Sequence, residues 1–169
     1  MREAIAALGA LALAAGCSRP SADVEPGAPR ARTTASDSAR ISLERRPCFG
    51  TCPVYTVTLE GSGVVRFEGV RFVKDTGTYV GTVPPARVDS LLAELEAAGY
   101  FTFADRYAMG DPSCPRYVTD LPTIVTQVRI GSRLKRVEHN RGCADAPERL
   151  SMLERRIDEV AGTERWVGK

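Results

Sequence analysis

The residues of this chain whose types and spacing could do chemistry are its cysteines and its single histidine. Cys48 and Cys52 bracket a short turn in the stretch CFGTCP, and Cys114, His139 and Cys143 follow far along the chain. Two thiolates and an imidazole would suit Cu(I), and a close pair of thiols could also carry out redox chemistry. An even number of cysteines in the folded region of an exported chain is instead typical of two disulfides.

Two features favour disulfides over a copper site. The CxxxCP motif with a distant histidine resembles the copper site of Sco-type chaperones, in which the motif opens a helix of a thioredoxin fold. In this chain the strand-like run VYTVTLE follows Pro53 instead, and two further cysteines would still need a role. Pro53 also stands where a c-type haem attachment motif requires histidine. We therefore interpret four cysteines as forming structural disulfides: Cys48, Cys52, Cys114 and Cys143. The alternative is a copper or thiol-redox site made of Cys48, Cys52 and His139.

Four cysteines can pair in three ways, and spacing alone does not choose among them. Residues four apart in an extended strand lie about 13 Å apart, so Cys48 and Cys52 can pair only across a turn. Gly50 permits that turn. We favour the local pairing of Cys48 with Cys52 and of Cys114 with Cys143. In a chain-entropy account the two bridges would contribute roughly 2 and 3.6 kcal/mol, respectively.

Residues 1–16 are predicted to form a lipoprotein signal peptide. Arg2 precedes an uncharged run of Ala and Leu that, at roughly 13 residues, is too short for a permanent membrane helix. The segment AAGC ending at Cys17 resembles a bacterial lipobox, in which the cysteine becomes the lipidated first residue. Ser18 resembles the outer-membrane default of Gram-negative lipoproteins. We therefore expect lipid on Cys17 and a place in the outer membrane facing the periplasm; ordinary signal cleavage and a disordered cytosolic start are the alternatives.

Residues 17–40 are predicted to tether the lipid to a folded domain. The stretch after Cys17 is rich in Ser, Pro, Ala and Thr, and Val24 is its only large aliphatic residue. Such a composition cannot bury enough apolar surface to fold. As a random coil it would span roughly 25–30 Å. A single domain of unknown function is expected to follow at residues 41–169.

Hydrophobic periodicity in the folded region predicts an α+β domain. Two alternating stretches with Gly-Ser turns predict β-hairpins at 54–69 and 123–139, and residues 71–83 could add one or two strands. Apolar stripes at helical spacing predict helices at 84–99 and 145–162. Because the pattern of two strands followed by a helix (ββα) occurs twice in the sequence, we expect an antiparallel sheet of about four to six strands with two helices packed on one face.

The apolar stripes of both helices should face the sheet. Asp145 and Glu148 stand at capping-box spacing at the start of the second helix. The expected core places four helical residues against four strand residues: Leu91, Leu95, Leu153 and Ile157 against Tyr55, Val57, Val128 and Ile130.

Composition and motifs exclude several functions. The net charge of +2, with scattered Lys and Arg, gives no electrostatic footprint for nucleic acid. The chain has no GxSxG, no HExxH and no phosphate-binding glycine loop, so we expect neither enzymatic activity nor a cofactor. We interpret His139 as a surface or loop histidine and Asp120, before Leu-Pro, as the cap of a turn. Asp120 and Tyr55 are the candidate binding residues.

The stretches PCFGTCPVYTVTLEGSG, RFV, VTDLPT and the GC before AP together resemble the domain-of-unknown-function family numbered 6438, found in bacterial lipoproteins. The resemblance covers roughly Ile41 to Val160. It implies an exported, small α+β domain and implies no activity. We expect a lipid-anchored, disulfide-stabilised domain of the cell envelope that acts as a binding or interaction module. Its partners would be the membrane, through the lipid, and an unknown envelope protein or glycan.

Overall fold

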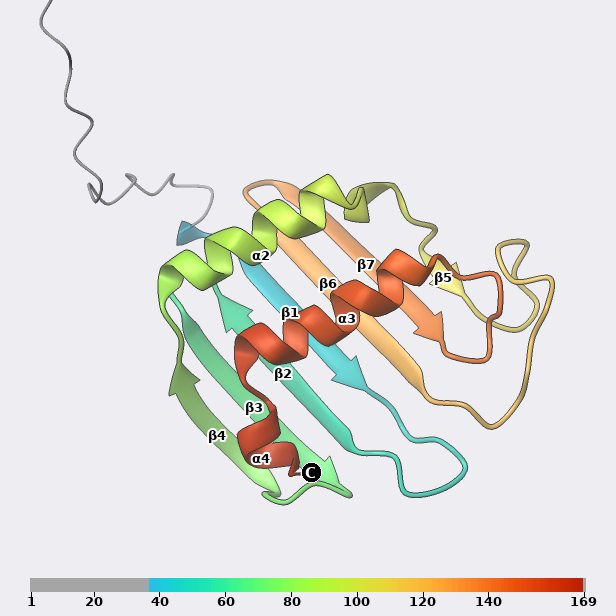
Figure 1. Cartoon of the computed structure of the whole chain (residues 1–169), viewed down its shortest axis with the longest axis horizontal. Coiled ribbons are helices and arrows are strands. Elements are labelled where there is room, and N and C mark those ends of the chain that lie inside the picture. Colours follow the sequence, from blue (N-terminus) through green and yellow to red (C-terminus); the bar gives the residue numbers. More distant parts are fainter. Residues whose placement is uncertain (1–36, 169) are drawn as a thin grey trace, which may run out of the picture. The chain divides into compact units, whose positions relative to one another are not determined.

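The domain is a seven-stranded sheet with its two main helices on one face (Figure 1). The computed structural model describes residues 37–168. The strand order is β4-β3-β2-β1-β6-β7-β5, and every neighbouring pair is antiparallel except β5 with β7. The strands are β1 (Arg40–Arg45), β2 (Val54–Glu60), β3 (Val64–Arg71), β4 (Gly77–Thr82), β5 (Arg106–Tyr107), β6 (Thr123–Ile130) and β7 (Arg133–Asn140). The helices are α2 (Pro85–Ala97), α3 (Glu148–Ala161), α4 (Glu164–Val167) and the 3-10 helix η1 (Tyr100–Thr102).

The α+β class and the one-sided helical layer are confirmed, but the sheet has seven strands rather than four to six. β1 accounts for one addition, and it lies at the centre of the sheet between β2 and β6. On β1 only two apolar side chains, Ile41 and Leu43, point into the core, so the alternating pattern in the sequence is short. The second addition is β5, which has two residues and lies parallel to β7.

The core lies between the sheet and the two helices, as the alternation of the strands requires. On β3, for example, Val65 and Phe67 are buried while Arg66 and Glu68 are exposed. The ring of Trp166 from α4 stacks on Phe67 with centroids 5.0 Å apart and covers that edge of the core. The predicted core is confirmed: Leu91, Leu95, Leu153, Ile157, Tyr55, Val57 and Val128 are buried, and Ile130 is partly buried against them.

Glycine ends each main helix, whereas the expected capping box does not form. Gly99 and Gly162 have positive φ angles of 72° and 65°, a left-handed conformation that glycine adopts without steric cost. Pro147 is the N-cap of α3, and no side chain caps it. The carboxylate of Asp145 accepts hydrogen bonds from Arg116 instead.

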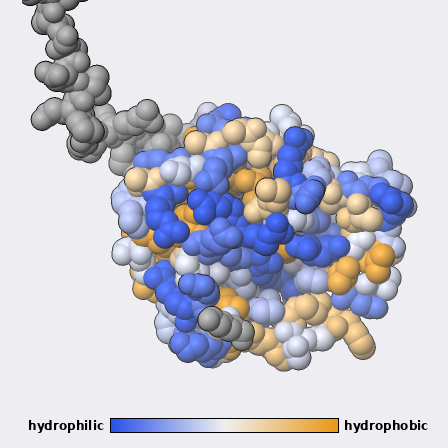
Figure 2. All heavy atoms as spheres, viewed as in Figure 1, coloured by the Kyte–Doolittle hydropathy of each residue, from blue (hydrophilic) through white to orange (hydrophobic). Residues whose placement is uncertain are grey.

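The outer surfaces of the helices are largely hydrophilic, as Figure 2 shows from the same side. Ion pairs connect α2 to its neighbours: Arg156 of α3 lies 2.9 Å from Glu94, and Arg133 of β7 pairs with Glu96. Within residues 37–168 no helix is both long enough and apolar enough to cross a membrane.

Candidate functional site

Both disulfides lie at the end of the sheet where β1 and β7 end and β2 and β6 begin. The structure joins Cys48 to Cys52, with Cα atoms 5.8 Å apart. It also joins Cys114 to Cys143, with Cα atoms 5.5 Å apart. This is the pairing that the sequence favours. The bridges therefore fix the loops beyond the strands rather than the strands themselves.

The first disulfide closes a short loop that presents an aromatic side chain to solvent. Phe49 is 88% exposed, the largest value among the exposed large hydrophobic residues. Gly50 has a φ of +141°, which side-chain-bearing residues rarely adopt, and this conformation turns the chain back toward Cys52. The backbone N–H of Phe49 donates to the carbonyl oxygen of Asp120 at 3.3 Å. The loop is therefore held at two points, one covalent and one polar.

The neighbouring loop before β6 adds two more exposed apolar side chains. Val118 and Leu121 are 60% and 44% exposed, and Asp120 between them touches the Phe49 loop. Asp120 has a positive φ of 71° and accepts a hydrogen bond from the Thr119 hydroxyl at 3.1 Å. It therefore occupies a bend of the chain, and its predicted role as the cap of a turn stays a prediction. We call Phe49, Val118 and Leu121 the apolar loop surface.

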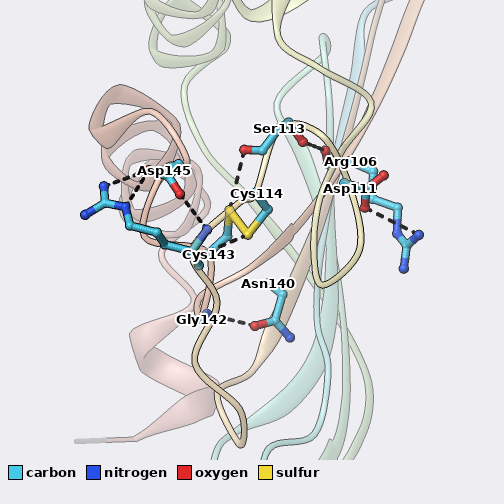
Figure 3. Close-up of a disulfide and its surroundings, with 9 residues drawn as sticks. Arg106, Asp111, Ser113, Cys114, Asn140, Gly142, Cys143 and Asp145 are labelled. Carbon is cyan, nitrogen blue, oxygen red and sulfur yellow. Dashed lines mark hydrogen bonds and ion pairs between the residues drawn. A yellow bond between two sulfur atoms is a disulfide. The ribbon is translucent and has the colours of Figure 1, made fainter.

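The second disulfide pins this loop to the start of α3, as Figure 3 shows. Gly142 packs so closely on the loop that a Cβ atom there would lie 1.9 Å from the carbonyl oxygen of Val118. The Val118 N–H in turn donates to the carbonyl of Gly142 at 2.9 Å. The side chain of Asn140 accepts from the Gly142 N–H at 2.8 Å. Only glycine fits at this position, which explains the GC pair in the sequence.

Asp145, which lies near the same disulfide in Figure 3, forms an ion pair with Arg116. The guanidinium of Arg116 donates to Asp145 at 2.6 and 2.9 Å, and the Arg116 backbone N–H donates at 2.9 Å. These hydrogen bonds lower the pKa of Asp145, and the bond from the Arg116 side chain has the largest effect. Because Arg116 is exposed and Asp145 only half-buried, the pair is expected to contribute little to the stability of the fold.

Tyr55 lies in a polar network under the C-terminal end of α3. Its hydroxyl donates to Asp158 at 2.7 Å and accepts from Arg45 at 2.9 Å. Arg45 also donates to Asp158 at 2.5 and 2.9 Å, and the Thr163 hydroxyl donates to Asp158 at 3.0 Å. Burial, followed by the charge of Asp158, raises the pKa of Tyr55. The hydroxyl therefore stays protonated and links β1, β2 and α3.

A pocket of about 400 Å³ opens beside this network at the turn between α3 and α4. Tyr55, Asp158, Glu159 and Glu164 contribute to its lining. The carboxylate of Asp158 is already engaged by three donors, so it acts as a structural acceptor. Of the two candidate binding residues, Tyr55 is thus a buried member of a network and Asp120 an exposed member of a loop.

The interpretation of His139 as a surface or loop histidine is wrong. His139 is 2% exposed, and its Nδ1 lies 2.8 Å from Oε1 of Glu154, which is 1% exposed. Its ring meets that of Tyr107 edge-on at 6.3 Å. Strand alternation places His139 on the same inward face as Val137. The buried pair thus joins β7 to α3.

Sequence reasoning missed Glu154, although its position held a signal. Glu154 lies four residues after Leu150 and three before Ile157, so it falls within the apolar stripe of α3. An ionisable residue in such a stripe indicates a buried partner on the facing sheet. Phe49 was missed for a different reason, since its exposure depends on how the disulfide loop projects.

The alternative copper set is not brought together. Cys48 and Cys52 are bonded to each other, and Nδ1 of His139 faces Glu154 beneath α3. Across the described part of the chain, no group of three or more His, Cys, Asp or Glu side chains is placed to hold a metal ion.

Comparisons with known proteins name no activity for this chain. No curated protein matches the chain. A family model, described as Domain of unknown function (DUF6438), matches residues 39–161. The match runs from the residue before β1 to the end of α3, and so includes both disulfides. The chain therefore belongs to the DUF6438 family.

Proposed function

We propose that this chain is a lipid-anchored binding module of the cell envelope that holds an envelope protein through its apolar loop surface. One observation carries the proposal: Phe49 is 88% exposed on a loop closed by a disulfide. Burying a phenylalanine on a partner contributes roughly 1.5–3 kcal/mol. Because the loop is closed covalently, little further order is lost on binding.

The surroundings of Phe49 support a protein partner. Val118 and Leu121 are also exposed on the neighbouring loop, and the hydrogen bond between Phe49 and Asp120 holds the two loops together. Aromatic anchors surrounded by smaller contacts are typical of protein interfaces. A glycan, the other partner considered, would rather require a row of polar groups. The proposal assigns the domain no catalytic step and no cofactor.

The membrane is the second partner in this proposal. Cys17 and the tether at residues 17–40 lie almost entirely outside the described residues, so the anchor rests on the sequence alone. Several acyl chains on one residue would make membrane attachment effectively permanent. We place the protein in the outer membrane, facing the periplasm, because Ser18 follows the lipidated cysteine.

Cross-linking in intact cells tests the binding surface. The full chain and its Phe49→Ser and Leu121→Ser variants would be compared with a Met152→Ser control, since Met152 is 54% exposed on α3 and is not part of the apolar loop surface. We expect one protein adduct that the control retains and both loop variants lose. Because these side chains are exposed, thermal unfolding should change little. An adduct that survives Phe49→Ser and Leu121→Ser would refute this surface, and adducts with glycan alone would refute the protein partner.

A further inference from the structure

β4 is an edge strand of the sheet within the described residues, and its own sequence lacks the charges and prolines that usually protect such an edge. Figure 1 shows β4 at one edge and the two-residue β5 at the other. Among the described residues, β4 pairs with β3 alone, in an uninterrupted register. Its sequence, GTYVGT, contains no charge and no proline. Charges, prolines and bulges are what normally keep an edge strand from adding another strand.

The hydrogen bonds of β4 determine which backbone groups face outward. Val64 lies opposite Thr82, and the N–H of Val83 donates to the carbonyl of Gly63 at 2.9 Å. Val64 and Thr82 are therefore a non-hydrogen-bonded pair, and bonded pairs alternate with such pairs along an antiparallel ladder. It follows that three residues of β4 bond to β3 and the three between them direct N–H and C=O outward. The inward set is Gly77, Tyr79 and Gly81, and the outward set is Thr78, Val80 and Thr82.

We propose that β4 pairs antiparallel with β4 of a second copy of this chain, about a two-fold axis at Val80. In this register Val80 lies opposite Val80, and Thr78 of each copy lies opposite Thr82 of the other. All three outward residues then find a partner, and each pair exchanges two N–H to O bonds. The two seven-stranded sheets become one continuous sheet.

The side chains of β4 fit this register as well as the backbone does. Tyr79 lies opposite Phe67 on the helix-facing side, and the register sets it over Gly81 of the other copy. The guanidinium of Arg165 fills the space over Gly81, where a Cβ would lie 2.7 Å from it. The incoming ring would therefore meet this guanidinium, and a cation–π contact could form between them. On the other face Val80, 60% exposed, would pack on its own copy, and β4 itself contains no charged residue.

Amide exchange tests the register residue by residue. The full chain would carry Cys17→Ser, so that neither an acyl group nor a free thiol contributes to association. We expect the amides of Thr78, Val80 and Thr82 to become protected as protein concentration rises, in step with a dimer in sedimentation. The amides of Tyr79 and Gly81 should be protected at every concentration. Val80→Pro removes an outward N–H without breaking a hydrogen bond to β3, so this variant should be a folded monomer. Val80→Thr keeps the N–H and serves as the control, which should still dimerise.

Three results would overturn the proposal. The first is a monomer at every concentration, with the outward amides exchanging freely. The second is protection of Thr78, Val80 and Thr82 that does not depend on concentration, because it would show that another part of the same chain covers the edge. The third is a dimer that survives Val80→Pro.

Discussion

At the scale of single residues, polar side chains tie the sheet to α3 at two points, one of them part-buried and the other buried. Arg45 and Tyr55 meet Asp158, and His139 meets Glu154. A buried polar group without a partner is costly, so each contact fixes the position of the helix as well as stabilising it. Both contacts favour the observed position of α3 on the sheet.

Replacing Tyr55 by Phe tests the first of these points. The change removes a hydroxyl that serves both Arg45 and Asp158, so the free energy of unfolding should fall by about 1–2 kcal/mol. Burial raises the pKa of Tyr55. A raised pKa gives stability that is complete below the unfolded value of about 10 and is lost as pH rises toward the folded value. The difference between wild type and Tyr55→Phe in denaturant titrations should therefore shrink above about pH 10, whereas a constant difference would contradict this account.

The sequence allowed the position of Tyr55 to be predicted but not that of His139. Tyr55 was placed in the core because it alternates with Val57 in a clear strand. His139 was misassigned because Asn140 and Gly142, close after it, are typical of a loop. Its position two residues after Val137 in a strand nevertheless indicated the inward face. The partners of a buried polar residue come from other elements, and one sequence does not show which face which.

At the scale of elements, the hairpins and helices were predictable and the shortest strands were not. β2, β3, β6 and β7 alternate over seven or eight residues, and both main helices end at glycine. β1 and β5 have six and two residues, so neither carries a long enough pattern. Long-range pairing defines both strands, since β1 needs β2 and β6 beside it.

The two disulfides should differ in how much they stabilise the domain. Replacing Cys114 and Cys143 together by Ser opens a bridge across 29 residues, so the free energy of unfolding should fall by about 3.6 kcal/mol. Replacing Cys48 and Cys52 together opens a bridge across four residues and should cost about 2 kcal/mol. Changing both partners avoids an unpaired thiol. Denaturant unfolding gives the two values, and a larger loss for the Cys48–Cys52 pair would reverse the predicted order.

At the scale of the whole molecule, the α+β architecture followed from the sequence but the apolar loop surface did not. Phe49 and Leu121 are far apart in the chain, and only the folded sheet brings their loops into contact. Each side chain alone looks like an ordinary apolar residue beside a turn. Loop conformation depends on a few polar contacts and close approaches, such as that of Gly142 to Val118, which leave no periodic pattern.

The lipid anchor is a prediction about the whole chain. Cys17→Ser should release the protein from the membrane fraction, because a serine has no thiol to receive the acyl group. Intact-mass measurement should find lipid on the first residue of the mature wild-type protein. A Ser21→Ala variant, altered within the tether, should stay membrane-bound. Unchanged membrane attachment after Cys17→Ser would contradict the proposal.

The central position of β1 has a mechanical consequence. β1 begins at Arg40, where the chain enters the domain, and ends at Arg45, beside the loop that carries Phe49. If the chain before residue 40 is fixed to a membrane and Phe49 is held by a partner, tension between them runs along the length of β1. The ladders to β2 and β6 on either side then resist in shear, so many hydrogen bonds must break together rather than one after another. Because β1 pairs along its whole length on both sides, we expect the domain to resist tension between the membrane and the partner.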